Sequence, residues 1–117
     1  MAKLELTLHG PFDEIADFIV QGVLDGSSTA SLEEKSTFFG DGARCAVYVF
    51  ERYSYLGGNR VSLTVMLFQA EPSCVRLSAI ATGGSQAMFI KMNTFGERSF
   101  LNKLDELLRR SRYIRPN

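Results

Sequence analysis

Three consecutive stretches of the chain, residues 43–53, 60–69 and 73–82, alternate apolar and less apolar side chains. Alternation with a period of two is typical of strands that bury one face and leave the other wet. The links between these stretches are short and contain glycine or proline, which favours hairpins and therefore antiparallel neighbours. The middle of the chain is thus predicted to form an antiparallel sheet whose apolar face needs other elements to cover it.

A strand and a helix are predicted before these stretches. Residues 3–9 alternate, and Gly10 and Pro11 stop that strand. The next segment repeats apolar residues at helical spacing and ends at Gly26, which indicates an amphipathic helix. Its apolar stripe consists of Phe12, Ile15, Ala16, Ile19, Val20 and Val23. Residues 28–38 indicate a weaker strand with a polar face.

A second helix is predicted at the C-terminal end. Thr94 and Glu97 have the spacing of a capping box, in which each side chain bonds the backbone amide of the other, so we expect the helix to begin at Thr94. Its apolar stripe consists of Phe100, Leu101, Leu104, Leu107 and Leu108. Residues 86–93 are interpreted as a last short strand, and residues 113–117 as a frayed tail.

The pattern as a whole predicts an α+β fold. The 117 residues suffice for one domain, residues 1–117, with a core that needs no metal or disulfide. We predict an antiparallel sheet of five or six strands with two helices on one face, in the order β-α-β-β-β-β-(β)-α. Sequential hairpins favour neighbouring strands in order.

The alternation also assigns side chains to the two faces of the sheet. The helix-covered face is predicted to hold Cys45, Val47, Val49, Val61, Leu63, Val65, Leu67, Val75, Leu77, Ala79 and Ala81. The second face then carries Ala46, Tyr48, Phe50, Met66, Phe68 and Ile80, mixed with Arg44, Arg52, Ser62, Thr64, Arg76 and Ser78. That is more aromatic and sulfur-containing surface than a solvated face normally shows, so we expect it to meet another subunit or to line a cavity. A shift of one residue in register would exchange the faces.

Composition excludes some classes of partner. Basic and acidic residues number 13 each, so no overall field attracts nucleic acid or an anionic membrane. No apolar run approaches the ~18 residues of a spanning helix, and the N-terminus alternates like a strand rather than resembling a signal peptide. We therefore expect a cytoplasmic location, with Cys45 and Cys74 as reduced thiols that pack as small core residues.

No combination of residues commits the chain to a reaction, a cofactor or a metal. The only histidine, His9, has no nucleophile or second ligand at informative spacing. A turn formed by Gly83, Gly84, Ser85 and Gln86 could hold an anion through its amides, although such turns more often mark a bulge. Arg52 lies between Glu51 and Tyr53 in a pattern that can stack on bases. Cross-strand packing explains this pattern better, because the chain has no excess positive charge.

Two phrases resemble those of a known family. They are ERYSYLGGNRVSL over residues 51–63 and GGSQAMFIKMNTFGE over residues 83–97. Together with the length and the opening strand, they make the chain similar to a small family of bacterial proteins that is catalogued as a domain of unknown function. The resemblance spans nearly the whole chain and implies a free-standing bacterial protein of one domain. It implies no activity, cofactor or catalytic residue.

Three functional hypotheses follow. The first is a non-enzymatic interaction module that forms a homodimer through the second face, with Tyr48, Phe50, Arg52, Met66 and Phe68 as its candidate residues. The second is a carrier of a small apolar ligand or lipid in a pocket between the last helix and the sheet, near Gly83, Gly84, Ser85 and Gln86. The third is an enzyme, which requires Glu51, Arg52, His9 and Gln86 to converge in one cleft.

Overall fold

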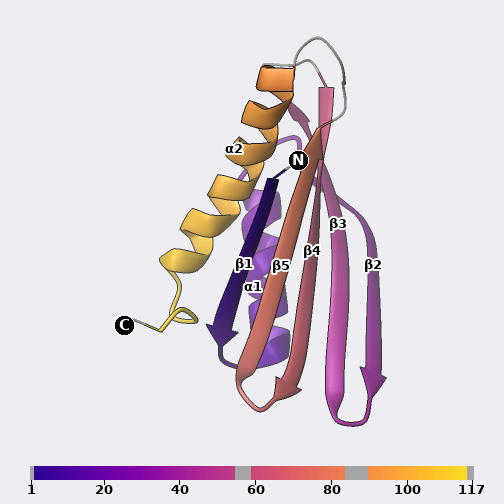
Figure 1. Ribbon diagram of the computed structural model, residues 1–117, viewed down its shortest axis with the longest axis vertical. Helices are drawn as coiled ribbons and strands as arrows, with labels where there is room; N and C mark the ends of the chain where they lie inside the picture. Colours follow the sequence, from indigo (N-terminus) through magenta and orange to yellow (C-terminus); the bar gives the residue numbers. More distant parts are fainter. Residues whose placement is uncertain (1, 55–58, 84–89, 116–117) are drawn as a thin grey trace.

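The computed structural model describes residues 2–54, 59–83 and 90–115. Its elements follow one another as β1 (Ala2–His9), α1 (Phe12–Asp25), β2 (Ser31–Gly40), β3 (Ala43–Ser54), β4 (Asn59–Glu71), β5 (Cys74–Gly83) and α2 (Ile90–Arg109) (Figure 1). The α+β fold is therefore confirmed, with five strands in the predicted order. Helix α2 begins at Ile90 rather than Thr94, so residues 90–93 are helical and not part of a last strand. Residues 86–89 lie outside the described residues.

The strands form one sheet in the order β1-β5-β4-β3-β2, with every neighbouring pair antiparallel. The consecutive strands β2 to β5 form the predicted meander. Strand β1 departs from sequential order, because it pairs with β5 along its whole length, from Ala2 opposite Ala81 to His9 opposite Cys74. The first and second strands therefore lie at opposite edges of the sheet, and α1 makes the crossing between them (Figure 1).

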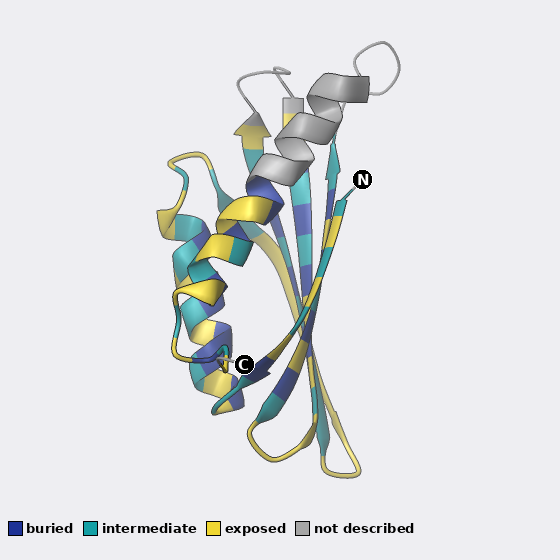
Figure 2. Ribbon diagram, turned by 60° about the vertical axis from the view of Figure 1, so that its left-hand side comes forward, coloured by how far each residue is buried: buried dark blue, intermediate teal, exposed yellow. Residues whose placement is uncertain are grey.

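Both helices cover the same face of the sheet, and the other face is open (Figure 2). Helix α2 lies over β5, β1 and β4, whereas α1 lies beside α2 and contacts β2. The apolar stripe of α1 is buried as predicted except at Val20, which is half-buried. The largest side chains with no more than 2% exposure are Phe50, Leu8, Ile15, Ile19, Leu63, Leu67, Leu104 and Leu108. They form one core between the two layers.

The face assignment is correct for β4 and β5 but wrong for β3. Phe50 pairs with Leu63 and Tyr48 with Val65, so these aromatic side chains point under the helices. Phe50 is fully buried, Tyr48 is 8% exposed, and Ala46 is buried with them. The neighbours Cys45, Val47 and Val49 are only half-buried and lie on the open face instead. Packing explains this, because the space between sheet and helices requires the larger aromatic volumes.

The chain beyond α2 is anchored rather than frayed at Tyr113. This residue is 5% exposed, and its carbonyl oxygen accepts a 2.7 Å hydrogen bond from the amide of His9. Its ring packs edge-on against Phe18, with 5.3 Å between the ring centroids. The Tyr113 hydroxyl donates to the Glu14 carboxylate at 2.6 Å, and Arg112 donates to the same group. The segment after α2 thus contacts both the end of β1, at His9, and the first turn of α1, at Glu14.

None of the helices among the described residues is long and apolar enough to cross a lipid bilayer.

Candidate interaction surface

The open face of the sheet carries a continuous band of apolar side chains, here named the apolar band. It consists of Phe38, Cys45, Val47, Val49, Met66, Phe68 and Ile80. Phe38 is 63% exposed, and Met66, Phe68 and Ile80 are 41%, 39% and 38% exposed. Apolar side chains scattered singly are normal on a protein surface, whereas a group of them on one face makes that face a candidate interaction surface.

Strand register brings the members of the band together. Phe38 lies opposite Cys45, which lies opposite Phe68, so these three side chains form one row across β2, β3 and β4. Val47 and Met66 form the next row. Directly opposed side chains on one face of a sheet are in contact range. The band is therefore a property of the pairing, and the sequence order of its members does not reveal it.

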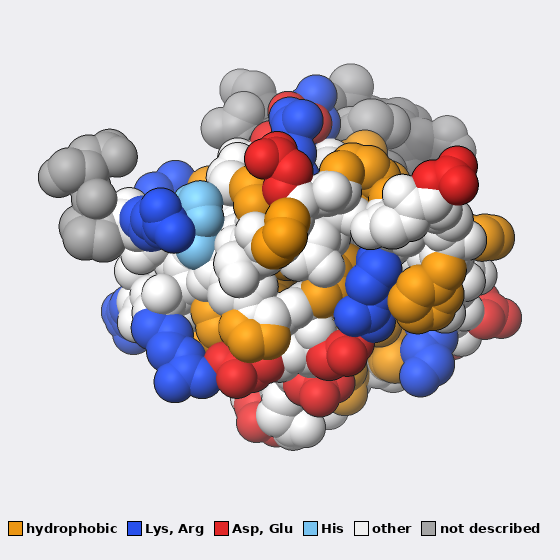
Figure 3. Space-filling model, turned by 90° about the horizontal axis from the view of Figure 1, so that it is seen from below, with side chains coloured by type: hydrophobic (Ala, Val, Ile, Leu, Met, Phe, Trp, Pro, Cys, Tyr) orange, Lys and Arg blue, Asp and Glu red, His pale blue; other side chains and the backbone are white. Residues whose placement is uncertain are grey.

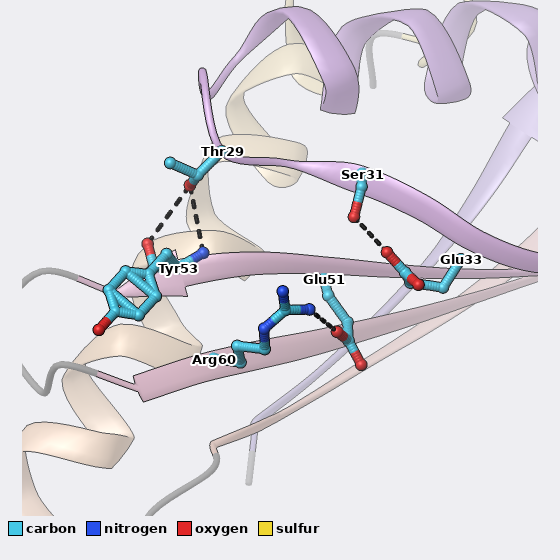
Figure 4. Close-up of polar contacts among 6 residues, drawn as sticks. All are labelled: Thr29, Ser31, Glu33, Glu51, Tyr53 and Arg60. Carbon is cyan, nitrogen blue, oxygen red and sulfur yellow. Dashed lines mark hydrogen bonds and ion pairs between the residues drawn. The ribbon is translucent and has the colours of Figure 1, made fainter.

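Charged side chains of both signs surround the apolar band. They include the basic residues Lys3, Arg60 and Arg76 and the acidic residues Glu5, Glu34, Glu51 and Glu71. Arg60 and Glu51 form an ion pair of 2.6 Å between β4 and β3 (Figure 4). Neither sign forms a large uniform patch among the described residues of this face.

One part of the open face is hollowed. A groove of about 430 Å³ runs between β1 and β4, with Met66 and Phe68 along one side and Glu5 and Thr7 along the other. Its base is formed by Arg76 and Ser78 of β5. The Ser78 hydroxyl lies 3.5 Å from the Glu5 carboxylate. The open face is thus not flat where β1, β5 and β4 run side by side.

The edge strand β2 is unsuited to pairing with another chain. Its residues 33–40 are exposed on both sides, include three consecutive charged residues, and follow a register shift between Leu32 and Glu34. Charges and bulges on an edge strand discourage edge-to-edge pairing. Before β2, Thr29 bonds the backbone of Tyr53, because its hydroxyl accepts from the Tyr53 amide at 3.1 Å and lies 3.5 Å from its carbonyl (Figure 4). This side chain holds the loop where the pairing with β3 begins.

The predicted site residues do not all reach the open face. Met66 and Phe68 do, whereas Tyr48 and Phe50 are core residues. Arg52 also lies on the helix side, with its guanidinium 4.5 Å from the centre of the Phe100 ring, and burial lowers its pKa. Burial likewise raises the pKa of Tyr48, and the carboxylates of α1 add to this effect.

Arg44, also expected on the second face, lies on the helix side. Its guanidinium stacks on the Phe12 ring at 4.2 Å and on the Phe39 ring at 5.0 Å, while it bonds Asp13 at 2.6 Å. Near each end of β3, the guanidinium of an arginine thus covers an aromatic ring on the helix side of the sheet: Arg44 covers Phe12, and Arg52 covers Phe100.

The residues named for enzymatic chemistry are separated. His9 lies at one end of the open face, opposite Cys74, and Glu51 lies near the other end, opposite Ser62. Arg52 is on the other side of the sheet. Gly83 ends β5 opposite Val61, whereas Gly84, Ser85 and Gln86 lie outside the described residues. No cleft brings the three described residues together.

Cys45 and Cys74 are both free thiols and half-buried. Both lie on the open face, and Cys45 belongs to the apolar band rather than to the core as predicted. In the part of the chain that the structure describes, no three His, Cys, Asp or Glu side chains are arranged to hold a metal ion.

Four members of the apolar band were not predicted to lie on the second face: Phe38, Cys45, Val47 and Val49. Cys45, Val47 and Val49 were missed because the two faces of β3 were predicted the wrong way round. The fourth carried a signal, because Phe38 and Phe39 are adjacent aromatic residues beside a glycine turn. Adjacent residues of a strand point to opposite faces, so one of the two had to lie on the open side.

The end of the molecule that holds the β2–β3 and β4–β5 turns shows no comparable patch. Figure 3 shows basic and acidic side chains interspersed there with separate hydrophobic ones. The geometry therefore defines a two-layer α+β domain with one covered and one open sheet face, and with its apolar surface concentrated on the open face.

The chain belongs to a family of unknown function (DUF6054), whose model matches residues 1–112. This confirms the resemblance seen in the sequence. Comparisons with curated proteins and with solved structures gave no match.

Proposed function

We propose that this protein is a non-enzymatic interaction module that forms a homodimer through the open face of its sheet. The observation that carries the proposal is the apolar band, in which Phe38, Met66, Phe68 and Ile80 are 38–63% exposed. Burying such a band in an interface stabilises the complex by roughly 25 cal/mol for each Å² of apolar surface removed from water. The proposed face is the one expected from the sequence, but Tyr48, Phe50 and Arg52 are replaced by the members of the band.

The size of the open face supports a second copy as the partner. Five strands about 4.8 Å apart, paired over about eight residues at about 3.3 Å each, give a footprint roughly 25 Å square. Stable interfaces bury about 800 Å² per partner. That footprint is about 600 Å² before the relief of the surface is counted, so a dimer would have to use the whole open face.

The charges on the open face support self-pairing in a specific arrangement. A two-fold axis along β4 places Phe68 and Met66 against the same residues of the second copy. It also places β1 of one copy over β2 of the other. Lys3 and Glu34 lie in the same row of the sheet, since Ile80, Thr64 and Val49 pair in sequence between them. Lys3 of each copy then lies over Glu34 of the other, within reach of a long side chain.

Light scattering coupled to size exclusion tests the proposal. We expect the wild-type chain to elute with the mass of two chains at high concentration and to dissociate on dilution. Phe68→Lys places a charge at the centre of the band and should give the mass of one chain. Phe68 is 39% exposed, so circular dichroism should show an unchanged fold.

Phe38 and Phe39 provide a matched pair. They are adjacent in β2, and are 63% and 72% exposed, but only Phe38 lies on the open face. We expect Phe38→Lys to weaken the dimer and Phe39→Lys to leave it intact. Lys3→Glu should also weaken it, and adding Glu34→Lys to that variant should restore it. A wild-type monomer at millimolar concentration, or equal effects at positions 38 and 39, would overturn the proposal.

The proposal takes the chain to be a bacterial cytoplasmic protein. The free, half-buried state of Cys45 and Cys74 supports a reducing compartment. The open face has no excess of basic over acidic side chains among its described residues, which favours a protein partner over nucleic acid.

A further inference from the structure

The helix side of the molecule contains a second hollow, independent of the open face. A pocket of about 280 Å³ lies where the end of α1 meets α2 and β3. Its α1 side is lined by Gly22 and Gly26, which are one helical turn apart and therefore on the same side of α1. These positions carry no side chain to fill the space between the helices. At Gly22 the two helices are in close contact, since a Cβ there would lie 2.2 Å from the Leu107 side chain.

The inner wall of this pocket is apolar. It is formed by Val23, Phe100, Leu104 and Leu107, of which the first three are at most 7% exposed. Small-molecule sites are mostly apolar hollows with a few placed polar groups, and they range from roughly 300 to 1,000 Å³. A pocket of about 280 Å³ is near the lower limit, so it suits a small ligand.

Among the described residues, the rim of the pocket carries more basic than acidic side chains, although the chain as a whole is neutral. Arg52, Lys103 and Arg110 line it, with Glu106 as the only carboxylate among the lining residues that the structure describes. Arg52 stacks on Phe100, and Lys103 donates to the carbonyl oxygen of Gly26 at 3.0 Å. Within the described part of the chain, the Arg110 side chain forms no ion pair, whereas its neighbour Arg109 is bonded to Asp105 at 2.9 Å. Arg110 is thus the rim cation best placed to meet an anion.

We propose that this pocket binds a small anionic amphiphile, with a single carboxylate at the basic rim and a short hydrocarbon chain against the apolar wall. The hydrocarbon chain of the ligand would pack against the apolar wall, and its negative charge would lie at the basic rim. A guanidinium fork matches a carboxylate in geometry as well as in charge. The inference does not rest on self-association, because the pocket lies on the opposite side of the sheet from the apolar band.

Titration followed by amide NMR tests this site, with octanoate as the probe. Octanol has the chain without the charge, and acetate has the charge without the chain. We expect octanoate to shift the Gly22 and Gly26 amides in a saturable way, and both comparison compounds to bind at least tenfold more weakly. Octanol binding as tightly as octanoate would overturn the proposal. So would octanoate shifts confined to the apolar band, or no binding of octanoate.

Two adjacent arginines provide the matched variants. Arg110→Gln should weaken octanoate binding about tenfold and leave octanol binding unchanged, whereas Arg109→Gln should change neither. Both residues are exposed, so neither variant should affect the fold. Equal effects of the two variants would show that general surface charge attracts octanoate, which would refute a defined site. Phe68→Lys should dissociate the dimer while octanoate binding persists, so the two proposals can fail separately.

Discussion

Replacing Tyr113 by alanine tests whether the segment after α2 is part of the folded core. The ring is 5% exposed, packs against Phe18, and lies so close to Gly10 that a Cβ there would be 3.0 Å from it. Gly10 has a φ of 149°, a conformation that other residues rarely adopt. The ring thus covers the turn that leads from β1 into α1.

The cost of this replacement can be worked out from its burial. Truncating a buried aromatic side chain to alanine costs about 3–5 kcal/mol, because the transfer free energy is lost and a cavity remains. For a chain of this length, each kcal/mol corresponds to roughly 4 °C in Tm. We therefore expect Tyr113→Ala to lower Tm by about 12–20 °C. Tyr113→Phe keeps the ring and loses only the bond to Glu14, so its effect should be smaller.

Differential scanning calorimetry measures these changes, with Arg115→Ala as an exposed control nearby. The reasoning predicts the order Tyr113→Ala, Tyr113→Phe, Arg115→Ala from the largest decrease in Tm to the smallest. A Tyr113→Ala variant that melts within about 2 °C of wild type, half the shift expected per kcal/mol, would refute the anchoring of this segment.

Three further perturbations have defined outcomes. Hydrogen bonds from Tyr113, and to a smaller extent from Arg112, lower the pKa of Glu14 below 4.5. The folded state therefore gains stability as the pH rises towards 4.5 and loses it as the pH falls through the lowered pKa. Urea melts at several pH values should show that Glu14→Gln reduces this loss of stability at acidic pH. Thr29→Val removes the bonds to the Tyr53 backbone, which should cost about 1 kcal/mol and speed hydrogen exchange of the Tyr53 amide. Gly22→Ala should lower the free energy of unfolding by about 1 kcal/mol, because the added Cβ clashes with Leu107. In a Leu107→Ala background the clash is absent, so a double-mutant cycle should show that the same change raises the free energy of unfolding through the higher helix propensity of alanine.

How far the sequence predicts the fold is clearest in the three central strands. In β4 one phase is wholly apolar, with Leu63, Val65 and Leu67 inward, whereas the other mixes Met66 and Phe68 with Ser62 and Thr64, and the face of this strand was predicted correctly. β3 is apolar in both phases, so alternation alone cannot choose between them. The choice depends on the volume available under the helices and on the pairing of Phe50 with Leu63, both of which are tertiary effects.

Local signals at the second helix and the tail were overridden in the same way. The spacing of Thr94 and Glu97 marks a helix start, but α2 already begins at Ile90. Tyr113 lies in a short segment with no periodicity, and its partners Phe18 and Glu14 are on a helix near the other end of the chain. Sequence patterns that extend over a few residues cannot report contacts of that range. The members of the apolar band on β2 and β3 escaped prediction for the same reason, because their place depends on strand pairing.

The pairing of β1 with β5 affects how this chain emerges during synthesis. The hydrogen-bonding partner of Ala2 is Ala81, so the leading strand cannot complete its ladder until most of the polypeptide has been made. At about 5–20 residues per second, that delay is roughly 4–15 seconds. Throughout it, Leu4, Leu6 and Leu8 lack the strand beside which they lie in the folded chain. Although β1 is the first of the described strands to be made, its only neighbour in the sheet is the last.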